Sequence, residues 1–143
     1  MKTTGHLKRS LLKSAVGFHG HLGPYLVLGL RIGHAAVQAL HPHGRDELYA
    51  TIWTSKSPPE SCILDGIQIS SGCTLGRGNL RTRNASKIKA RFREGNRSVV
   101  IRPAKETVRL LLRVSRLTPQ EKLRKMARLL NCMPDGDLLV VDT

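Results

Sequence analysis

Residues 24–40 have the sequence PYLVLGLRIGHAAVQAL, and the organisation of the rest of the chain is best understood around this stretch. Pro24 suits the first turn of a helix, where a missing N–H costs no hydrogen bond. Apolar residues recur at helical spacing and extend over most of the circumference. A helix that is apolar nearly all round has to be covered on every side. The sequence therefore predicts a central, buried helix from Tyr25 to Leu40.

The segments around this helix mix short helices with short strands. Helical patterns cover 8–16, 60–70, 106–117 and 118–130, and strand patterns cover 47–53, 86–93, 99–101 and 138–141. We read 60–70 as a helix followed by a glycine-rich loop. The order shows no βαβ rhythm, so we expect an α+β fold. We predict a single core domain over 1–143, with the central helix packed on a mixed or antiparallel sheet and with C-terminal helices and a short strand in 104–143.

Length and composition restrict the class of protein. The chain has 143 residues, 40% of them hydrophobic, which is enough for one domain with its own core. No stretch approaches the roughly 18 uninterrupted apolar residues that span a bilayer, so we expect no membrane segment. The three cysteines are an odd number without disulfide-scaffold spacing, which favours a reducing cytoplasm.

The formal charge of +14 is concentrated in the second half of the chain. Residues 1–70 carry seven Lys and Arg against four acids, and residues 71–143 carry the other 17 against six. Such a distribution suits an acidic protein partner, an anionic small molecule or a nucleic acid. Phe92 is the only aromatic residue within 77–128, however, and single-strand binding surfaces interleave aromatics with cations. We therefore expect one of the first two partners, or else a basic surface that only keeps the protein in solution, and keep nucleic acid as a disfavoured alternative.

The first stretch whose side chains could bind a metal or take part in catalysis is FHGHLGP at 18–24. In an extended segment, His19 and His21 would project to the same side, because side chains alternate with period two. At the entrance of the central helix, the helix dipole disfavours imidazolium and leaves neutral imidazole free to bind a metal. Both histidines are therefore candidate metal ligands, and capping or surface histidines are the alternative.

The second stretch is SGCTLGRGN at 71–79. Its three glycines permit positive φ and close approach of a ligand to the backbone. Cys73 lies near potential N–H donors and Arg77, an environment that lowers a thiol pKa. Thiolate and neutral imidazole together suit Zn²⁺ or another divalent transition metal. Cys62 is a further candidate ligand, or else a small buried hydrophobe.

A nucleophilic pair of Cys73 and His21, with Asp65 or Glu60 orienting the histidine, explains the same residues. Metal ligation and covalent catalysis both require these two side chains close together, so both interpretations stay open. The loop lacks the spacing of a P-loop, and no CxxC occurs. The residues that we expect to shape the ligand pocket are Gly72, Thr74, Arg77 and Asn79.

These motifs resemble those of the FmdE family of formylmethanofuran dehydrogenase proteins. The resemblance covers about 17–101 and rests on FHGH at 18–21, DGIQ at 65–68, GCT at 72–74 and GRGNL at 76–80. It implies an α+β core domain that dimerises and that brings His19 and His21 near Cys73 at a metal-binding or active site. It also implies a link to one-carbon, methanogenesis-type metabolism, either as a metal-binding protein or as a non-catalytic accessory subunit that docks through its basic half.

Three features depart from the family pattern. Gly23 stands where many members carry a cysteine, so one candidate sulfur ligand is missing. Arg77 stands where lysine is common, which replaces a point charge with a planar fork. The chain corresponds to the core domain without the cysteine-rich zinc finger that some members add. A homodimer is also expected because a second copy is a simple way to cover a helix that is apolar nearly all round.

Overall fold

The computed structural model describes residues 7–143, and residues 1–6 of the predicted domain lie outside this part. The helices are α1 (Arg9–His19), α2 (Pro24–Leu40), α3 (Ile63–Ser71), α4 (Lys105–Leu111), α5 (Gln120–Cys132) and α6 (Asp135–Leu138). The strands are β1 (Tyr49–Thr54), β2 (Leu80–Asn84), β3 (Lys89–Glu94), β4 (Arg97–Pro103) and β5 (Leu139–Asp142). Short 3-10 turns, η1 (Arg45–Glu47) and η2 (Glu60–Cys62), precede β1 and α3. None of the helices in the described part is long and apolar enough to cross a bilayer.

The five strands form one mixed sheet in the order β2-β1-β3-β4-β5. β1 and β2 are parallel, and the other neighbours are antiparallel. The sequence did not predict β2, because only Leu80 of this edge strand is buried and the strand has no hydrophobic alternation. With α3 between them, β1 and β2 make one βαβ unit where none was expected. The α+β class is confirmed, since the remaining strands pair antiparallel.

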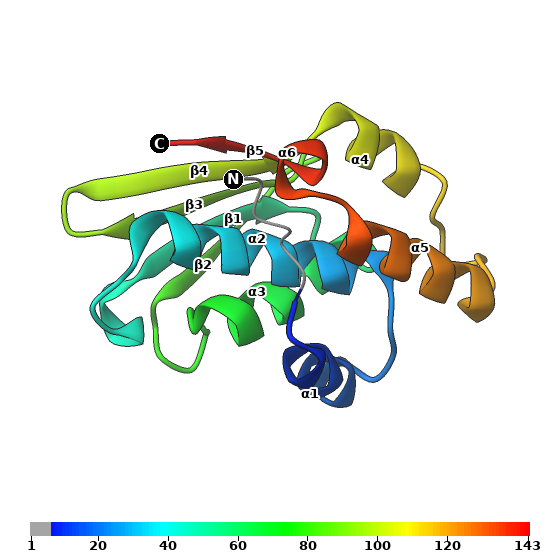
Figure 1. The fold of residues 1–143 in the computed structure, drawn as a ribbon, viewed down its shortest axis with the longest axis horizontal. Helices are drawn as coiled ribbons and strands as arrows, with labels where there is room; N and C mark the ends of the chain where they lie inside the picture. Colours follow the sequence, from blue (N-terminus) through cyan, green and yellow to red (C-terminus); the bar gives the residue numbers. More distant parts are fainter. Residues whose placement is uncertain (1–6) are drawn as a thin grey trace.

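Helix α2 is the centre of the fold, as the sequence predicted. It packs against the sheet through β3 and β4, and against α3 and α5 on its other sides. Figure 1 shows α2, α3 and α5 on the same side of the sheet. One chain thus covers most of the apolar helix and leaves only Gln38 of α2 exposed, so a homodimer no longer rests on that argument and stays a prediction.

The backbones of α2 and α3 touch where two glycines face the partner helix. A Cβ on Gly29 would lie 2.1 Å from the carbonyl oxygen of Ile63, and one on Gly66 would lie 2.3 Å from that of Leu26. Only glycine permits so close an approach. The contact holds the N-terminal end of α3 against the first half of α2, and this places Asp65 beside the end of α1.

Arg31 is fully buried on α2, which the helical pattern did not anticipate. Its guanidinium donates hydrogen bonds to the carbonyl oxygens of Leu130, Asn131 and Met133, and to the carboxylate of Asp135 at 2.7 Å. These carbonyls belong to the end of α5, where a helix leaves its last acceptors unpaired and carries partial negative charge. Arg31 therefore fixes α5 onto α2.

The helix predicted over 106–117 is shorter than expected. α4 ends at Leu111, and residues 112–119 form turns that lead to α5. Within this connection Leu112 and Leu117 are exposed, whereas Val114 packs against the core. The connection consequently passes over the start of α2 and forms one wall of the cavity described next.

Candidate functional site

His19 and His21 lie on either side of the turn that joins α1 to α2. His19 is the last residue of α1, and Gly20 caps that helix with a φ of 110° while its N–H donates to the carbonyl of Val16 at 2.7 Å. The expected extended segment is therefore wrong, because a left-handed glycine turn takes its place. The two imidazole rings nevertheless lie side by side, with centroids 4.7 Å apart.

Asp65 of α3 holds the ring of His19. Its carboxylate lies 2.6 Å from Nδ1, and the His19 side chain is only 10% exposed. An ionised carboxylate can only accept, so in the neutral form of His19 the proton lies on Nδ1 and Nε2 keeps its lone pair. Nε2 is buried and has no hydrogen-bond partner among the described residues. Asp65 orients a histidine, as one sequence interpretation suggested, but the histidine is His19 rather than His21.

A cavity of about 410 Å³ opens beside these rings. Its lining includes His19, His21, Cys62, Pro24, Tyr25, Leu26, Val114 and Leu123. The walls come from α2, from the residues before α3, and from the connection 112–119. This size and mainly apolar lining with a few polar groups are typical of a small-molecule site.

The titratable groups of the cavity favour neutral forms. Partial burial, and then the neighbouring His19, lower the pKa of His21 below its usual 6.5. Burial, followed by the charges of Asp65 and Glu60, raises the pKa of the Cys62 thiol. Burial is also the main reason why the pKa of Tyr25 rises to about 12. At neutral pH the free cavity therefore presents a neutral imidazole at His21, a thiol and a phenol.

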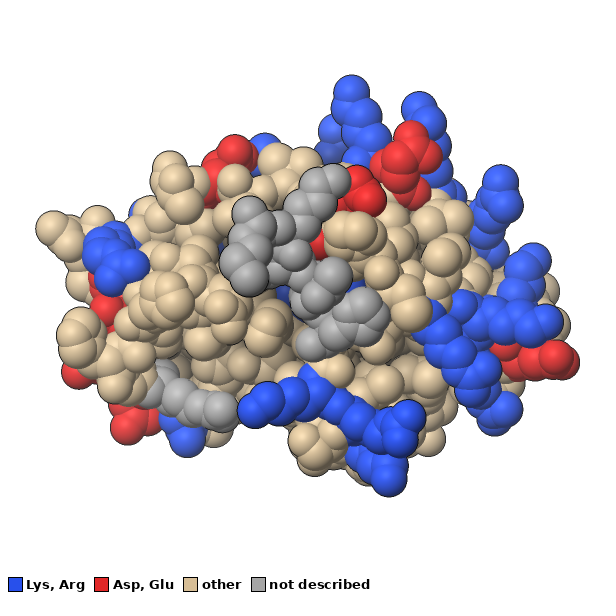
Figure 2. Space-filling model, viewed as in Figure 1, with Lys and Arg blue, Asp and Glu red and all other residues tan. Residues whose placement is uncertain are grey.

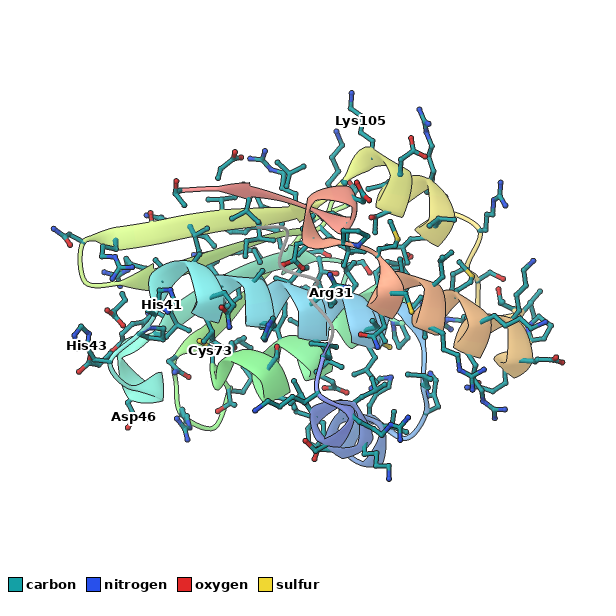
Figure 3. All side chains as sticks on the ribbon, in the orientation of Figure 1. Arg31, His41, His43, Asp46, Cys73 and Lys105 are labelled. Atoms are coloured by element: carbon teal, nitrogen blue, oxygen red, sulfur yellow. The ribbon has the colours of Figure 1, made fainter. Side chains whose placement is uncertain are left out.

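The structure does not bring Cys73 to the histidines. Cys62 directly precedes α3 and Cys73 follows its C-terminal cap, Gly72, so the length of α3 separates the two cysteines. Figure 3 shows Cys73 at the C-terminal end of α3. Cys73 is fully buried in the hydrophobic core, and its Sγ lies 3.4 Å from the carbonyl oxygen of Leu48. A pair of Cys73 with His21, for catalysis or for metal binding, is not formed in this arrangement.

The thiolate expected at Cys73 is also wrong. Burial raises the pKa of its thiol, and the hydrogen bond with Ser71 and the charge of Arg77 offset only part of that rise. The nearby donors are visible in the sequence, but the extent of burial is not, and burial is the larger effect on this pKa.

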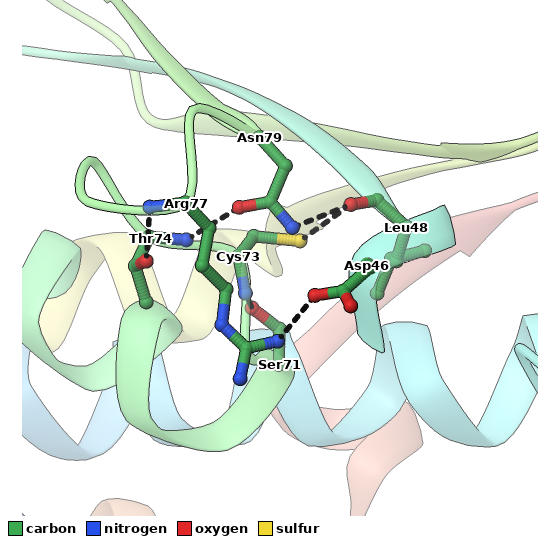
Figure 4. A network of polar contacts seen from close by, with 7 residues as sticks. All are labelled: Asp46, Leu48, Ser71, Cys73, Thr74, Arg77 and Asn79. Carbon is green, nitrogen blue, oxygen red and sulfur yellow. Dashed lines mark hydrogen bonds and ion pairs between the residues drawn. The ribbon is translucent and has the colours of Figure 1, made fainter. Parts of the chain in front are cut away.

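The loop after Cys73 is held by hydrogen bonds within itself and to the residues just before β1 (Figure 4). The amide oxygen of Asn79 accepts from the N–H of Thr74 at 2.9 Å, and its amide nitrogen donates to Leu48 at 3.0 Å. The Thr74 hydroxyl accepts from the N–H of Arg77, whose guanidinium pairs with Asp46 at 3.0 Å. With Gly72 in the left-handed conformation, these expected pocket residues instead join the end of α3 to β1 and β2.

A second group of metal-ligating side chains lies at the opposite end of α2. Within residues 7–143, three ligand atoms come within 4.8 Å of one another only at His43, Glu47 and Glu94. His43 and Glu47 are exposed, and Figure 3 shows His43 at the edge of the molecule. Sequence patterns did not reveal this group, because Glu94 lies 51 residues from His43 and only the pairing of β1 with β3 joins them. At the first cavity, His19, His21 and Cys62 do not reach this spacing.

Comparison with known proteins gives two matches. The family model described as "FmdE, Molybdenum formylmethanofuran dehydrogenase operon" matches residues 18–137. A protein of Archaeoglobus fulgidus named "Probable S-adenosyl-L-methionine-binding protein" is 34% identical over 77 residues, which cover 49% of this chain and 19% of that protein. The chain is thus similar to about a fifth of this longer relative.

Proposed function

This chain belongs to the FmdE family, and on that premise we propose that it binds a divalent transition metal, most simply Zn²⁺, at the cavity of His19, His21 and Cys62. The description of the family refers to the operon of a molybdenum formylmethanofuran dehydrogenase. We further propose that the protein is cytoplasmic and homodimeric and that it takes part in one-carbon metabolism.

One observation carries the proposal, namely the buried Nε2 of His19 that has no partner in the described part of the chain. A buried polar atom without a partner costs about 1–3 kcal/mol, so such an atom calls for an explanation. Metal-binding histidines commonly donate their second N–H to a carboxylate, which fixes the tautomer and strengthens the ligand. The 2.6 Å contact with Asp65 has this geometry and leaves the lone pair of Nε2 for a metal.

The other donors of the cavity suit the same ion. Imidazole and thiolate are favoured zinc ligands, and the lowered pKa of His21 keeps its imidazole neutral at pH 7. Binding to Cys62 would displace the proton that its raised pKa retains, which a zinc ion readily does. Since the three donors are not yet within ligand spacing, we expect Cys62 to change its rotamer when the metal binds. Cys73 is left out, because it lies in the core.

A metal held by three protein ligands keeps an open position, at which it can polarise a carbonyl or activate water. Asp65 would orient His19, and the phenol of Tyr25, whose hydroxyl donates to the carbonyl oxygen of Leu111 at 3.5 Å, would stay protonated beside the cavity. These residues are compatible with a catalytic site and with a structural one. In the second case the protein acts as an accessory subunit that docks onto an acidic partner through its basic half.

The metal content of protein purified without an affinity tag tests the proposal. We expect about one equivalent of zinc in the wild type and a large loss in His19→Ala and Asp65→Asn. The matched control is His43→Ala, which removes a histidine from the other ligand group and should retain the metal. A metal that is lost in His43→Ala and kept in His19→Ala would place the ion at His43, Glu47 and Glu94 and overturn the proposal.

S-adenosylmethionine is a second candidate ligand, favoured by the name of the archaeal relative and by the cavity volume of about 410 Å³. The chain spans only 19% of that relative, so we propose, from its name, that this protein binds the same ligand. Isothermal titration should show binding of S-adenosylmethionine that Val114→Trp abolishes by filling the cavity. Equal binding to wild type and variant would exclude this cavity.

A further inference from the structure

The face of the sheet that points away from α2 forms a separate surface. Strand side chains alternate between the two faces of a sheet. On β1 the buried Ala50 and Ile52 point to the helices. Tyr49, Thr51 and Trp53 therefore lie on the opposite side, which we call the open face. These three residues are exposed or half-buried, so the described helices leave them at least partly open to solvent.

Strand register surrounds these residues with positive charge. Tyr49 is paired with Arg93, Thr51 with Arg81 and Arg91, and Trp53 with Arg83 and Lys89. With Arg102 of β4, the open face presents six cations on the described strands. They are opposed on these strands by one acid, Asp142, which lies 3.5 Å from Arg102.

The two aromatic rings lie among these cations rather than apart from them. The ammonium of Lys89 stands 4.3 Å from the centroid of the Trp53 ring. The guanidinium of Arg93 lies 5.5 Å from that of Tyr49. Nucleic acid was disfavoured because no tyrosine or tryptophan lies within residues 77–128. That objection no longer holds, because β1 lies between β2 and β3 in the sheet. Tyr49 and Trp53 of β1 therefore lie among the cations of the two neighbouring strands.

The open face is hollowed at two places along its length. The smaller hollow has about 200 Å³ and is lined by Tyr49, Thr51, Arg81, Arg91 and Arg93. The larger has about 800 Å³ and extends from Trp53, Lys89 and Arg102 to Lys105 and Arg109 of α4. Figure 3 shows Lys105 projecting outward from the start of α4. The smaller hollow therefore combines one aromatic ring with three cations, and the larger combines Trp53 and Tyr25 with several cations and the carboxylate of Glu60.

We propose that the open face binds single-stranded nucleic acid. Bases stack on Tyr49 and Trp53, and the six cations neutralise the backbone phosphates, which is how sequence-tolerant single-strand binding surfaces work. A second copy of this chain is a poor occupant, because it would place six cations against six. Figure 2 shows further Lys and Arg on the helical side, over the end where α4 and α5 lie. This second basic surface lacks the strands of the open face, and it can therefore serve as a control for binding by positive charge alone.

Fluorescence measurements test the proposal directly, because Trp53 is the only tryptophan. Titration with a 12-nucleotide single-stranded RNA and with a DNA of the same sequence should quench its emission. Anisotropy of the labelled strands should give a log–log salt dependence with a slope of about −4, as expected for about six phosphate contacts. The two titrations show which nucleic acid is preferred, and binding of either supports the proposal.

Two double variants remove equal charge from different surfaces. Arg91→Gln with Arg93→Gln should weaken binding at least tenfold and reduce the salt slope by about 1.4. The control, Lys122→Gln with Arg128→Gln on exposed positions of α5, should change affinity less than threefold. Tyr49→Leu should cost at least fivefold through lost stacking.

Three results would overturn the proposal. The first is equal loss in both double variants. The second is that duplex, polyglutamate or anionic vesicles bind the protein as tightly as single strands do, and that Tyr49→Leu does not weaken the binding. This result would indicate a surface that binds polyanions in general. The third is no binding of either strand at about 50 mM salt. Circular dichroism of each variant separates these results from misfolding.

Discussion

Replacement of Gly29 by alanine should destabilise the protein strongly, because the new methyl group would enter the backbone of α3. The added Cβ would lie 2.1 Å from the carbonyl oxygen of Ile63, and two further backbone atoms of Ile63 lie at 2.9 Å. Carbon and oxygen rarely approach below about 3 Å, so α2 and α3 must separate by about 1 Å. Neither helix can yield locally, since the obstacle is backbone.

The expected cost follows from two opposing contributions. Overpacking of a filled core costs about 1–3 kcal/mol, and more where the backbone has to move. Alanine has a higher helix propensity than glycine, which returns up to about 1 kcal/mol. Because the obstacle here is backbone, we take the overpacking cost at about 4 kcal/mol. The net loss is then about 3 kcal/mol, which is a large part of the roughly 5–15 kcal/mol that stabilises a typical domain. The melting temperature should fall by about 10 °C.

Urea denaturation followed by circular dichroism measures this loss, and two other glycines calibrate it. A Cβ on Gly33 would meet the Ser70 hydroxyl, which can rotate away, so Gly33→Ala should cost about 1 kcal/mol or less. Gly17 of α1 has no atom within 4 Å of the added methyl, and Gly17→Ala should stabilise by about 0.5–1 kcal/mol. Equal costs for Gly29→Ala and Gly33→Ala, or a neutral Gly29→Ala, would refute the reasoning.

Three further predictions address the core and the cavity. Arg31→Met leaves three carbonyl oxygens and the Asp135 carboxylate without their donor, so chemical denaturation should show that the free energy of unfolding falls by about 3 kcal/mol. Arg31→Lys should not restore this stability, because an ammonium lacks the planar fork of donors. Gly23→Cys should tighten zinc binding about tenfold in competition with a chelator, because a Cβ at this position lies 3.5 Å from Nε2 of His21; an unchanged affinity would argue against a metal beside His21. Because the pKa of His21 is lowered in the folded protein, protonation of this residue favours the unfolded chain. The free energy of unfolding should therefore be retained above pH 6.5 and decline as the pH falls below that value, and zinc affinity should decline over the same acidic range. A pH dependence of unfolding that is identical in His21→Gln would contradict this.

Local patterns were sufficient for most of the elements. The apolar circumference of 24–40 predicted the buried α2, and the strand patterns at 86–93 and 99–101 predicted β3 and β4. The exposed edge strand β2 was missed because its position depends on pairing with β1 and not on its own side chains. The same pairing produces the open face, which no linear segment of the sequence reveals.

The candidate site shows a similar division. From the sequence alone, Cys73 and His21, followed by His19 and Cys62, were the candidate metal ligands, and Asp65 or Glu60 was the residue expected to orient a histidine. Only the tertiary structure determined which of them meet. The close contact of α2 and α3 brings Asp65 to His19, whereas the length of α3 carries Cys73 away into the core, where burial raises its pKa. Residue chemistry is a local property, but distance and burial depend on packing between segments that are remote in the chain.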